Sequence, residues 1–206
     1  MGFMRKYNFL LRKIHSLTGI VPIGIFLFEH LITNSFALGG AEYYNEKIEI
    51  FKDIPMLVAV EIIFIAIPLA YHTLFGLYYV YLAKNNVLDY KYYTNFMFYL
   101  QRVSAILAFL FVAEHAYTTR IGRAFTGIDI SYEFMNQILS QPVFFTIYLI
   151  GLLAAVFHFT NGIFTFAISW GITIGPRSQK VLQVVCVALF VVLSAVGIAG
   201  MTALAA

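Results

Sequence analysis

Five long apolar stretches set the architecture of this chain. A helix needs about 20 apolar residues to cross the hydrocarbon core of a membrane. The stretches at 16–35, 56–83, 98–119, 142–170 and 179–204 all qualify. Of the 206 residues, 61% are hydrophobic and 11% are charged, whereas about a quarter are charged in soluble domains. We therefore expect an all-α integral membrane protein with five transmembrane helices.

The segments between these stretches are short, so none can fold by itself. Residues 1–206 are predicted to form a single transmembrane domain, and any soluble catalytic domain must lie on another chain. The basic and then apolar residues 1–33 resemble a signal peptide. We interpret them as part of a retained first helix, because the apolar run is long enough to span and carries Glu29 and His30.

Lys and Arg are divided unevenly between the two sides of the predicted membrane domain. If the N-terminus is cytoplasmic, nine lie inside and four outside. The inner ones are Arg5, Lys6, Arg12, Lys13, Lys84, Lys91, Arg102, Arg177 and Lys180, and the outer ones are Lys47, Lys52, Arg120 and Arg123. Since basic residues are retained on the cytoplasmic side, the pattern predicts an inside N-terminus and an outside C-terminus.

Each of the first four apolar stretches contains one histidine, and an ionisable side chain inside a membrane is costly and usually functional. At 1.5 Å per residue, His30 and His115 lie about 20 Å above the inner face. His72 and His158 each lie about 24 Å below the outer face. Four histidines paired at two depths indicate axial ligands of two stacked b-type haems, an outer pair (His30, His115) and an inner pair (His72, His158).

Small residues lie on the same helix faces as these histidines. Gly19 and Ser104 precede the outer-pair histidines by eleven residues, which is close to three full turns. Gly76 and Gly162 follow the inner-pair histidines by four residues. We expect all four to face the bundle interior near the inner pair and to leave room for a flat macrocycle.

Two histidine ligands fill both axial positions of a haem iron, so such a haem transfers electrons. Two of them within the first four helices would form a transmembrane relay. Cys186 is the only cysteine, which excludes a Cys-x-x-Cys-His attachment and leaves the haems non-covalently held. The alternative from another class is a haem-free proton-coupled transporter, with Pro68 as a candidate break within a span.

Glu61 is the candidate quinone and proton site. It precedes His72 by eleven residues, so it shares that face and lies near the depth of the outer haem. A carboxyl group there can exchange protons with a quinol while the haem exchanges electrons. The alternative is an interfacial acid at a helix start, where the helix dipole favours it.

Other polar residues are weaker candidates. Arg12, Arg102 and Arg177 lie at the inner level and are candidate partners for the haem propionates; ordinary positive-inside anchoring is the alternative for each. Glu29 and Glu114 each precede an outer-pair histidine. Each is expected to extend to the membrane interface or to form an ion pair with Arg120 or Arg123, and a proton exit is the alternative. His15, at the inner boundary, has no partner in depth and is not predicted to be a ligand.

Several motifs together point to one family. They are Arg12 to Gly19 (RKIHSLTG), Phe28-Glu29-His30-Leu31, Tyr71-His72 with Gly76, Leu100-Gln101-Arg102-Val103, Glu114-His115, Phe157-His158-Phe159 with Asn161-Gly162, and Trp170-Gly171-Ile172-Thr173 followed by Pro176-Arg177-Ser178-Gln179. With these the chain resembles, over nearly its whole length, the cytochrome b558 membrane anchors of succinate dehydrogenase and fumarate reductase, in the single-chain, five-helix, dihaem class.

This resemblance implies a membrane subunit of respiratory complex II in a bacterial cytoplasmic membrane. It implies a low-potential outer haem b on His30 and His115 and a high-potential inner haem b on His72 and His158. It also implies two cytoplasmic partner chains, a flavoprotein with FAD that performs the dicarboxylate chemistry and an iron–sulfur protein. Electrons would pass through both haems to menaquinone. Lipid and quinone are expected partners, and nucleic acid is not.

The direction of the reaction stays open at this point, because the dicarboxylate site lies on another chain. A menaquinol:fumarate reductase is the main alternative, and the cytochrome b of a membrane hydrogenase or formate dehydrogenase is a more distant one. Some fumarate reductases carry an acid in the fifth helix, but residues 179–204 contain no Asp or Glu.

Overall fold

The computed structural model describes residues 2–206, except for the side chains of residues 2–7 and 123. Across that part of the chain the regular structure is entirely helical, without a strand. Five helical segments are long and apolar enough to cross a membrane, namely Asn8–Gly39, Leu57–Leu82, Tyr93–Thr126, Pro142–Ser169 and Pro176–Ala205. The predicted fold class, with five membrane-spanning helices, is therefore confirmed, while the predicted bounds of the spans and the single domain at 1–206 stay predictions.

The first span is an interrupted helix rather than one uniform α-helix. It consists of α1 (Gly2–Ile20), α2 (Pro22–Ser35) and a short 3₁₀ turn, Phe36–Gly39. Pro22 has no backbone N–H to donate, so regular α-helix is interrupted there. The N–H of Val21 still bonds the carbonyl of Leu17 at 2.9 Å, which keeps the two parts continuous. Pro22 is thus a second proline within a span, in addition to Pro68.

The second and third spans each contain a wide π turn. The second is α4 (Leu57–Glu61), the π turn Ile62–Ala66 and α5 (Ile67–Leu82). The third is α6 (Tyr93–Ala116), the π turn Tyr117–Ile121 and α7 (Gly122–Thr126). The first π turn lies directly before Pro68, where the missing N–H disturbs the helical hydrogen bonds. The predicted break at Pro68 is therefore absorbed within a continuous span.

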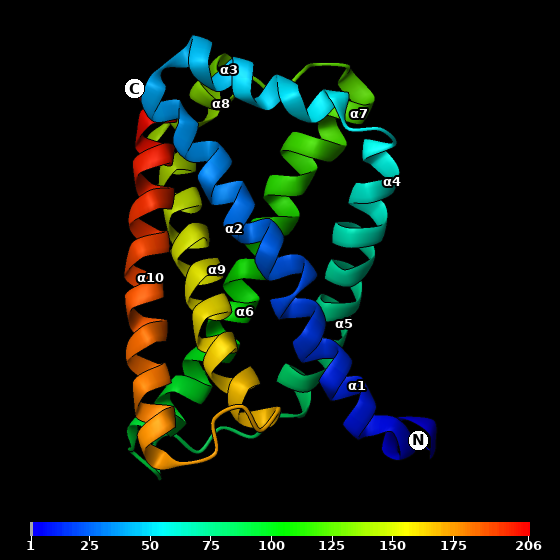
Figure 1. The fold of residues 1–206 in the computed structure, drawn as a ribbon, viewed down its shortest axis with the longest axis vertical. Coiled ribbons are helices and arrows are strands. Elements are labelled where there is room, and N and C mark those ends of the chain that lie inside the picture. Colours follow the sequence, from blue (N-terminus) through cyan, green and yellow to red (C-terminus); the bar gives the residue numbers. More distant parts are fainter. Residues whose placement is uncertain (1) are drawn as a thin grey trace.

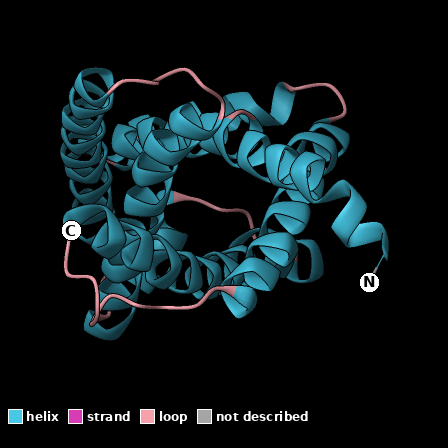
Figure 2. Cartoon of the chain, turned by 90° about the horizontal axis from the view of Figure 1, so that it is seen from below, coloured by secondary structure: helices cyan, strands magenta, loops and turns pink. Residues whose placement is uncertain are grey.

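The fourth and fifth spans are the uninterrupted helices α9 (Pro142–Ser169) and α10 (Pro176–Ala205). The spanning helices are arranged around a central region, seen along the bundle in Figure 2. The fifth, α10, lies at one edge and packs against α9 and α2 (Figure 1). A Cβ on Gly200 would lie 2.8 Å from the carbonyl oxygen of Asn34, so glycine permits the close approach of α10 to α2.

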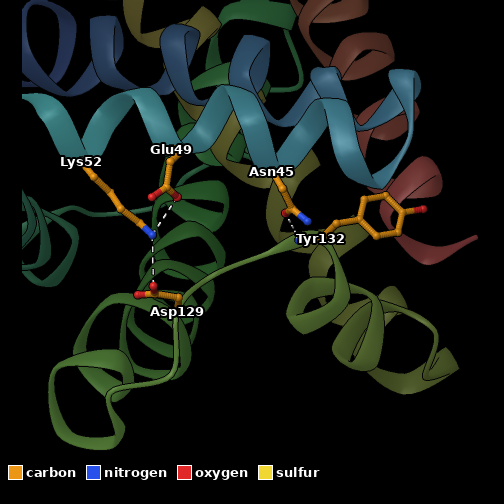
Figure 3. Close-up of polar contacts among 5 residues, drawn as sticks. All are labelled: Asn45, Glu49, Lys52, Asp129 and Tyr132. Atoms are coloured by element: carbon orange, nitrogen blue, oxygen red, sulfur yellow. Dashed lines mark hydrogen bonds and ion pairs between the residues drawn. The ribbon is translucent and has the colours of Figure 1, made fainter.

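The connectors that are predicted to lie outside form a cap over one end of the bundle (Figure 1). This outer cap consists of α3 (Ala41–Glu49), the 3₁₀ turn Ile50–Asp53 and α8 (Tyr132–Leu139). Lys52 bridges Glu49 at 2.7 Å and Asp129 at 3.1 Å, and the N–H of Tyr132 donates to Asn45 at 2.8 Å (Figure 3). These contacts join two connectors that are far apart in sequence. They hold the outer ends of the first and third spans at fixed positions.

Candidate functional site

Two histidine side chains meet in the inner half of the bundle. His72 on α5 and His158 on α9 have ring centroids 6.1 Å apart and ring planes at 83°. Nδ1 of His72 lies 2.9 Å from the carbonyl oxygen of His15, and Nδ1 of His158 lies 3.1 Å from that of Gln101. An imidazole that donates through Nδ1–H has Nε2 free to bind a metal. The backbone of neighbouring helices thus orients both rings in the same way.

A polar network around Gln101 fixes the position of His158. The side-chain amide of Gln101 donates to the carbonyl of His158 at 3.0 Å, and Asn161 donates to the Gln101 oxygen at 2.7 Å. The buried Ser104 hydroxyl lies 3.4 Å from Nδ1 of His158. These bonds join α6 to α9 on both sides of the histidine. They leave its ring little freedom to rotate.

The small residues predicted near the inner pair do lie at this level. A Cβ on Gly19 would lie 2.5 Å from Cε1 of His72, so only glycine fits there. At Gly76 the nearest atom is Cε1 of His15 at 3.2 Å, and at Gly162 it is Nε2 of Gln101 at 3.6 Å. Gly76 and Gly162 therefore leave space that the side chains of His15 and Gln101 approach.

His15 was expected to have no partner in depth, and that expectation is wrong, while its exclusion from the ligands stays a prediction. Its ring stacks on the His72 ring with centroids 4.1 Å apart and planes 9° apart. Its Nδ1 is buried and has no hydrogen-bond partner among the described residues. The sequence did contain a signal for this position, because His15 precedes Gly19 by four residues and so shares its helix face.

The second pair of histidines meets nearer the outer end. His30 on α2 and His115 on α6 have ring centroids 5.8 Å apart and ring planes at 67°. Gly19 touches His72, and His30 lies eleven residues further along the first span, which corresponds to about 16 Å. The structure thus brings together the same histidines that the depth estimates paired. Their ligation of iron stays a prediction.

The candidate proton site forms an ion pair. Nε of Arg120 lies 2.9 Å and Nη2 lies 2.6 Å from Oε2 of Glu61. Arg120 follows His115 by five residues, so the pair links the second and third spans beyond the outer histidines. The Glu61 side chain is 29% exposed, so it is not fully buried by the ion pair. The predicted outer location of Glu61 agrees with this contact.

Glu29 and Glu114 have other surroundings in the structure than the ion pairs considered for them. Arg120 pairs with Glu61, so the ion pair with Arg120, one of the alternatives for Glu29 and Glu114, is not formed. Glu29 instead accepts a hydrogen bond from the Thr33 hydroxyl at 2.5 Å. Oε2 of Glu114 is buried and lacks a hydrogen-bond partner within the described chain. The Arg123 side chain lies outside the described residues.

Known proteins place these features in one family. Residues 84–197 match the family described as the succinate dehydrogenase/fumarate reductase transmembrane subunit. Over 191 residues, which cover 93% of this chain and 94% of the relative, the chain is 43% identical to the succinate dehydrogenase cytochrome b558 subunit of Bacillus subtilis (strain 168). This chain belongs to the succinate dehydrogenase/fumarate reductase transmembrane subunit family. It is therefore the membrane subunit of an enzyme complex, and the transporter alternative loses its support.

Members of this family named as cytochrome b imply haem b, and the histidine pairs fit that group. Two imidazoles on opposite sides of one metal ion, each bonded at about 2 Å, have ring centroids about 6 Å apart. The observed separations are 5.8 and 6.1 Å. Among the described residues, no group of three or more His, Cys, Asp or Glu side chains is placed to hold a metal ion by itself. The centroid separations of the two histidine pairs fit a haem iron.

Among the three arginines that are candidate partners for the haem propionates, Arg102 has a guanidinium group with unpaired nitrogen atoms. Nε and Nη1 of Arg102 are buried without hydrogen-bond partners among the described residues, and the group lies 4.1 Å from the centroid of the Phe98 ring. Buried polar groups normally have partners, and a carboxylate matches guanidinium geometry. Arg102 thus fits a haem propionate.

The other two arginines have different surroundings. Nε of Arg12 donates to the Tyr79 hydroxyl at 2.5 Å, and the guanidinium lies over that ring. Arg177 is exposed at the start of α10, where it lines a shallow apolar depression with Val181 and Val185. Both positions suit anchoring at the membrane surface as well as propionate binding.

Proposed function

We propose that this chain is the dihaem cytochrome b subunit of a succinate:menaquinone oxidoreductase. The observation that carries the proposal is the presence of two histidine pairs, each about 6 Å between centroids, on four spanning helices at two levels. When bound at these pairs, haem b would supply one-electron transfer at each level. The outer pair is His30 with His115, and the inner pair is His72 with His158.

The protein would control the haems through the orientation of its own ligands. The inner histidines are fixed by hydrogen bonds to the backbone of α1 and α6. Two histidines would hold the haem at each level, and a haem held in this way would leave oxygen and substrate no position to bind. Arg102 would neutralise a propionate at the inner level. This arrangement suits electron transfer and disfavours chemistry at the iron.

Quinone would react near the outer pair. Glu61 and Arg120 offer a carboxylate that can exchange protons and a guanidinium that can bond a quinone oxygen. Glu61 is the last residue of α4 and Arg120 lies in the π turn before α7, and these two helices lie near the end of the bundle that the outer cap covers (Figure 1). We propose menaquinone as the substrate, because the chain resembles the dihaem class of this family.

The catalytic partners would bind at the opposite, cytoplasmic end. Nine of the thirteen basic residues lie on that side if the N-terminus is cytoplasmic. The partners would be a flavoprotein with FAD and an iron–sulfur subunit. The relative with 43% identity is named as a succinate dehydrogenase subunit, which supports succinate oxidation over the reverse reaction.

The test is a reduced-minus-oxidised visible spectrum of the purified complex, with haem quantified per chain and with succinate and dithionite added in turn. Two low-spin b haems per chain, one reduced readily by succinate and one mainly by dithionite, are expected. A colourless complex would overturn the proposal. Two haems that are not reduced by succinate but are reduced by menaquinol would assign the chain to a fumarate reductase or to another respiratory enzyme.

A further inference from the structure

The four paired histidines differ in the groups that their Nδ1 atoms contact. Both inner histidines lie against backbone carbonyl groups. Nδ1 of His115 instead lies 3.3 Å from the hydroxyl of Tyr148 on α9. In the described part of the chain, the His30 ring makes no hydrogen bond, and Phe26 lies 5.3 Å from it between centroids. The orientation of the outer pair therefore depends on a side chain, which mutation can change.

The Tyr148 ring is held firmly in place. It is 5% exposed, and its edge packs against Phe111, with centroids 5.2 Å apart and planes at 79°. Phe111 in turn lies against Gly151, where any Cβ would collide with its ring. The absence of a side chain at Gly151 brings α6 and α9 close together here. This packing presents the hydroxyl to His115 in a fixed position.

We propose that Tyr148 is a positioning residue for the outer haem and a determinant of its redox potential. Its hydroxyl accepts the Nδ1–H bond of His115, which selects the tautomer with Nε2 free for iron. A hydrogen bond at Nδ1 makes the imidazole a stronger donor and stabilises the ferric state. Loss of this bond would make the outer haem easier to reduce. The inference rests on the proposed dihaem function.

The test is a spectroscopic redox titration of the intact complex carrying Tyr148→Phe. This variant keeps the ring packing and removes the hydroxyl. We expect both haems to be retained and the ratio of reduced to oxidised outer haem at a fixed potential to rise about tenfold, or roughly 59 mV for one electron. The inner haem should keep its wild-type potential. An unchanged outer potential, or equal shifts in both haems, would overturn the proposal.

Tyr132→Phe is the matched control. The Tyr132 hydroxyl donates to the carbonyl of Ala203 at 2.6 Å, near the outer cap and without a histidine partner. Its loss should leave both potentials unchanged. If it shifts the outer potential as much as Tyr148→Phe does, the effect is general loosening of the outer end and the proposal is wrong.

A second pair of variants covers the case in which Tyr148→Phe fails to retain the outer haem. Tyr148→Gln removes the ring but supplies an acceptor oxygen, whereas Tyr148→Leu removes both the ring and the acceptor. Better retention in the glutamine variant supports the hydrogen bond, and equal loss in both rejects it. Failure of the dihaem function itself would be visible separately, since the wild-type complex would then lack an outer haem that depends on His115.

Discussion

The imidazole of His15 stacks face to face on that of His72, with 4.1 Å between ring centroids. The same residue accepts a hydrogen bond from Nδ1 of His72 through its backbone carbonyl. His15 thus restrains the candidate ligand in two ways, one of which does not depend on its side chain. Mutation can separate the stacking from the backbone bond.

Replacing His15 by alanine should reduce the inner haem content per chain while the outer haem is retained. The His72 ring would lose the neighbour that limits its rotation and keep its bond to the backbone. His15→Phe preserves a flat ring and should retain more inner haem than alanine does. Haem quantification with low-temperature spectra measures both. Equal inner haem in wild type and His15→Ala would show that the stack has no role in haem retention.

Replacing either histidine of one pair should remove the same haem and leave the other haem bound. Loss of either His72 or His158 should remove the inner spectral component, because each is proposed to supply one of the two protein ligands of that haem. Loss of either His30 or His115 removes the outer component. Visible difference spectra of each purified variant test this. The assignment is wrong if the His72 and His115 variants lack the same component.

Gly19→Ala should damage the inner site although it adds a single methyl group. That methyl would lie 2.5 Å from Cε1 of His72, so the ring or the helix must move, at a cost of about 1–3 kcal/mol typical of overpacking. Gly162→Ala is the matched control, since its methyl would lie an ordinary 3.6 Å from Gln101. Haem content and thermal stability should fall in the first variant only. Equal behaviour of both variants would contradict the close contact.

Glu61→Gln should slow quinone turnover while both haems remain bound, because glutamine keeps the size of the side chain and cannot exchange a proton. Glu133→Gln is the control, since Glu133 lies on the outer cap and bonds to Asn45, away from the histidines. Succinate:quinone activity and the visible spectrum are measured together. Unchanged turnover in Glu61→Gln would remove its proposed proton role.

The membrane orientation can be tested with single cysteines in a Cys186→Ser background. Ile128→Cys lies in the outer connector and Leu88→Cys in an inner one, and both positions are exposed. An impermeant maleimide added to intact cells should label Ile128→Cys and spare Leu88→Cys. The opposite pattern would place the N-terminus outside and move the proposed partner surface to the other face.

Much of this molecule follows from one-dimensional rules. Apolar length alone identified all five spans, since a membrane requires about 20 such residues in every helix. The fixed rise of 1.5 Å per residue matched His30 with His115 and His72 with His158, because depth depends on sequence position more than on packing. The same rise and the helical period placed Gly19 and Ser104 at the inner level.

Other features depended on how the helices rotate and bend against one another. The contacts of His15 with His72, of Glu61 with Arg120 and of Tyr148 with His115 join atoms whose separation is not fixed by distance along the chain. A shift of one residue turns a side chain by about 100° on its helix, and crossing angles are set by packing. Sequence therefore determined which residues share a level of the membrane, and only the tertiary structure decided which of them touch.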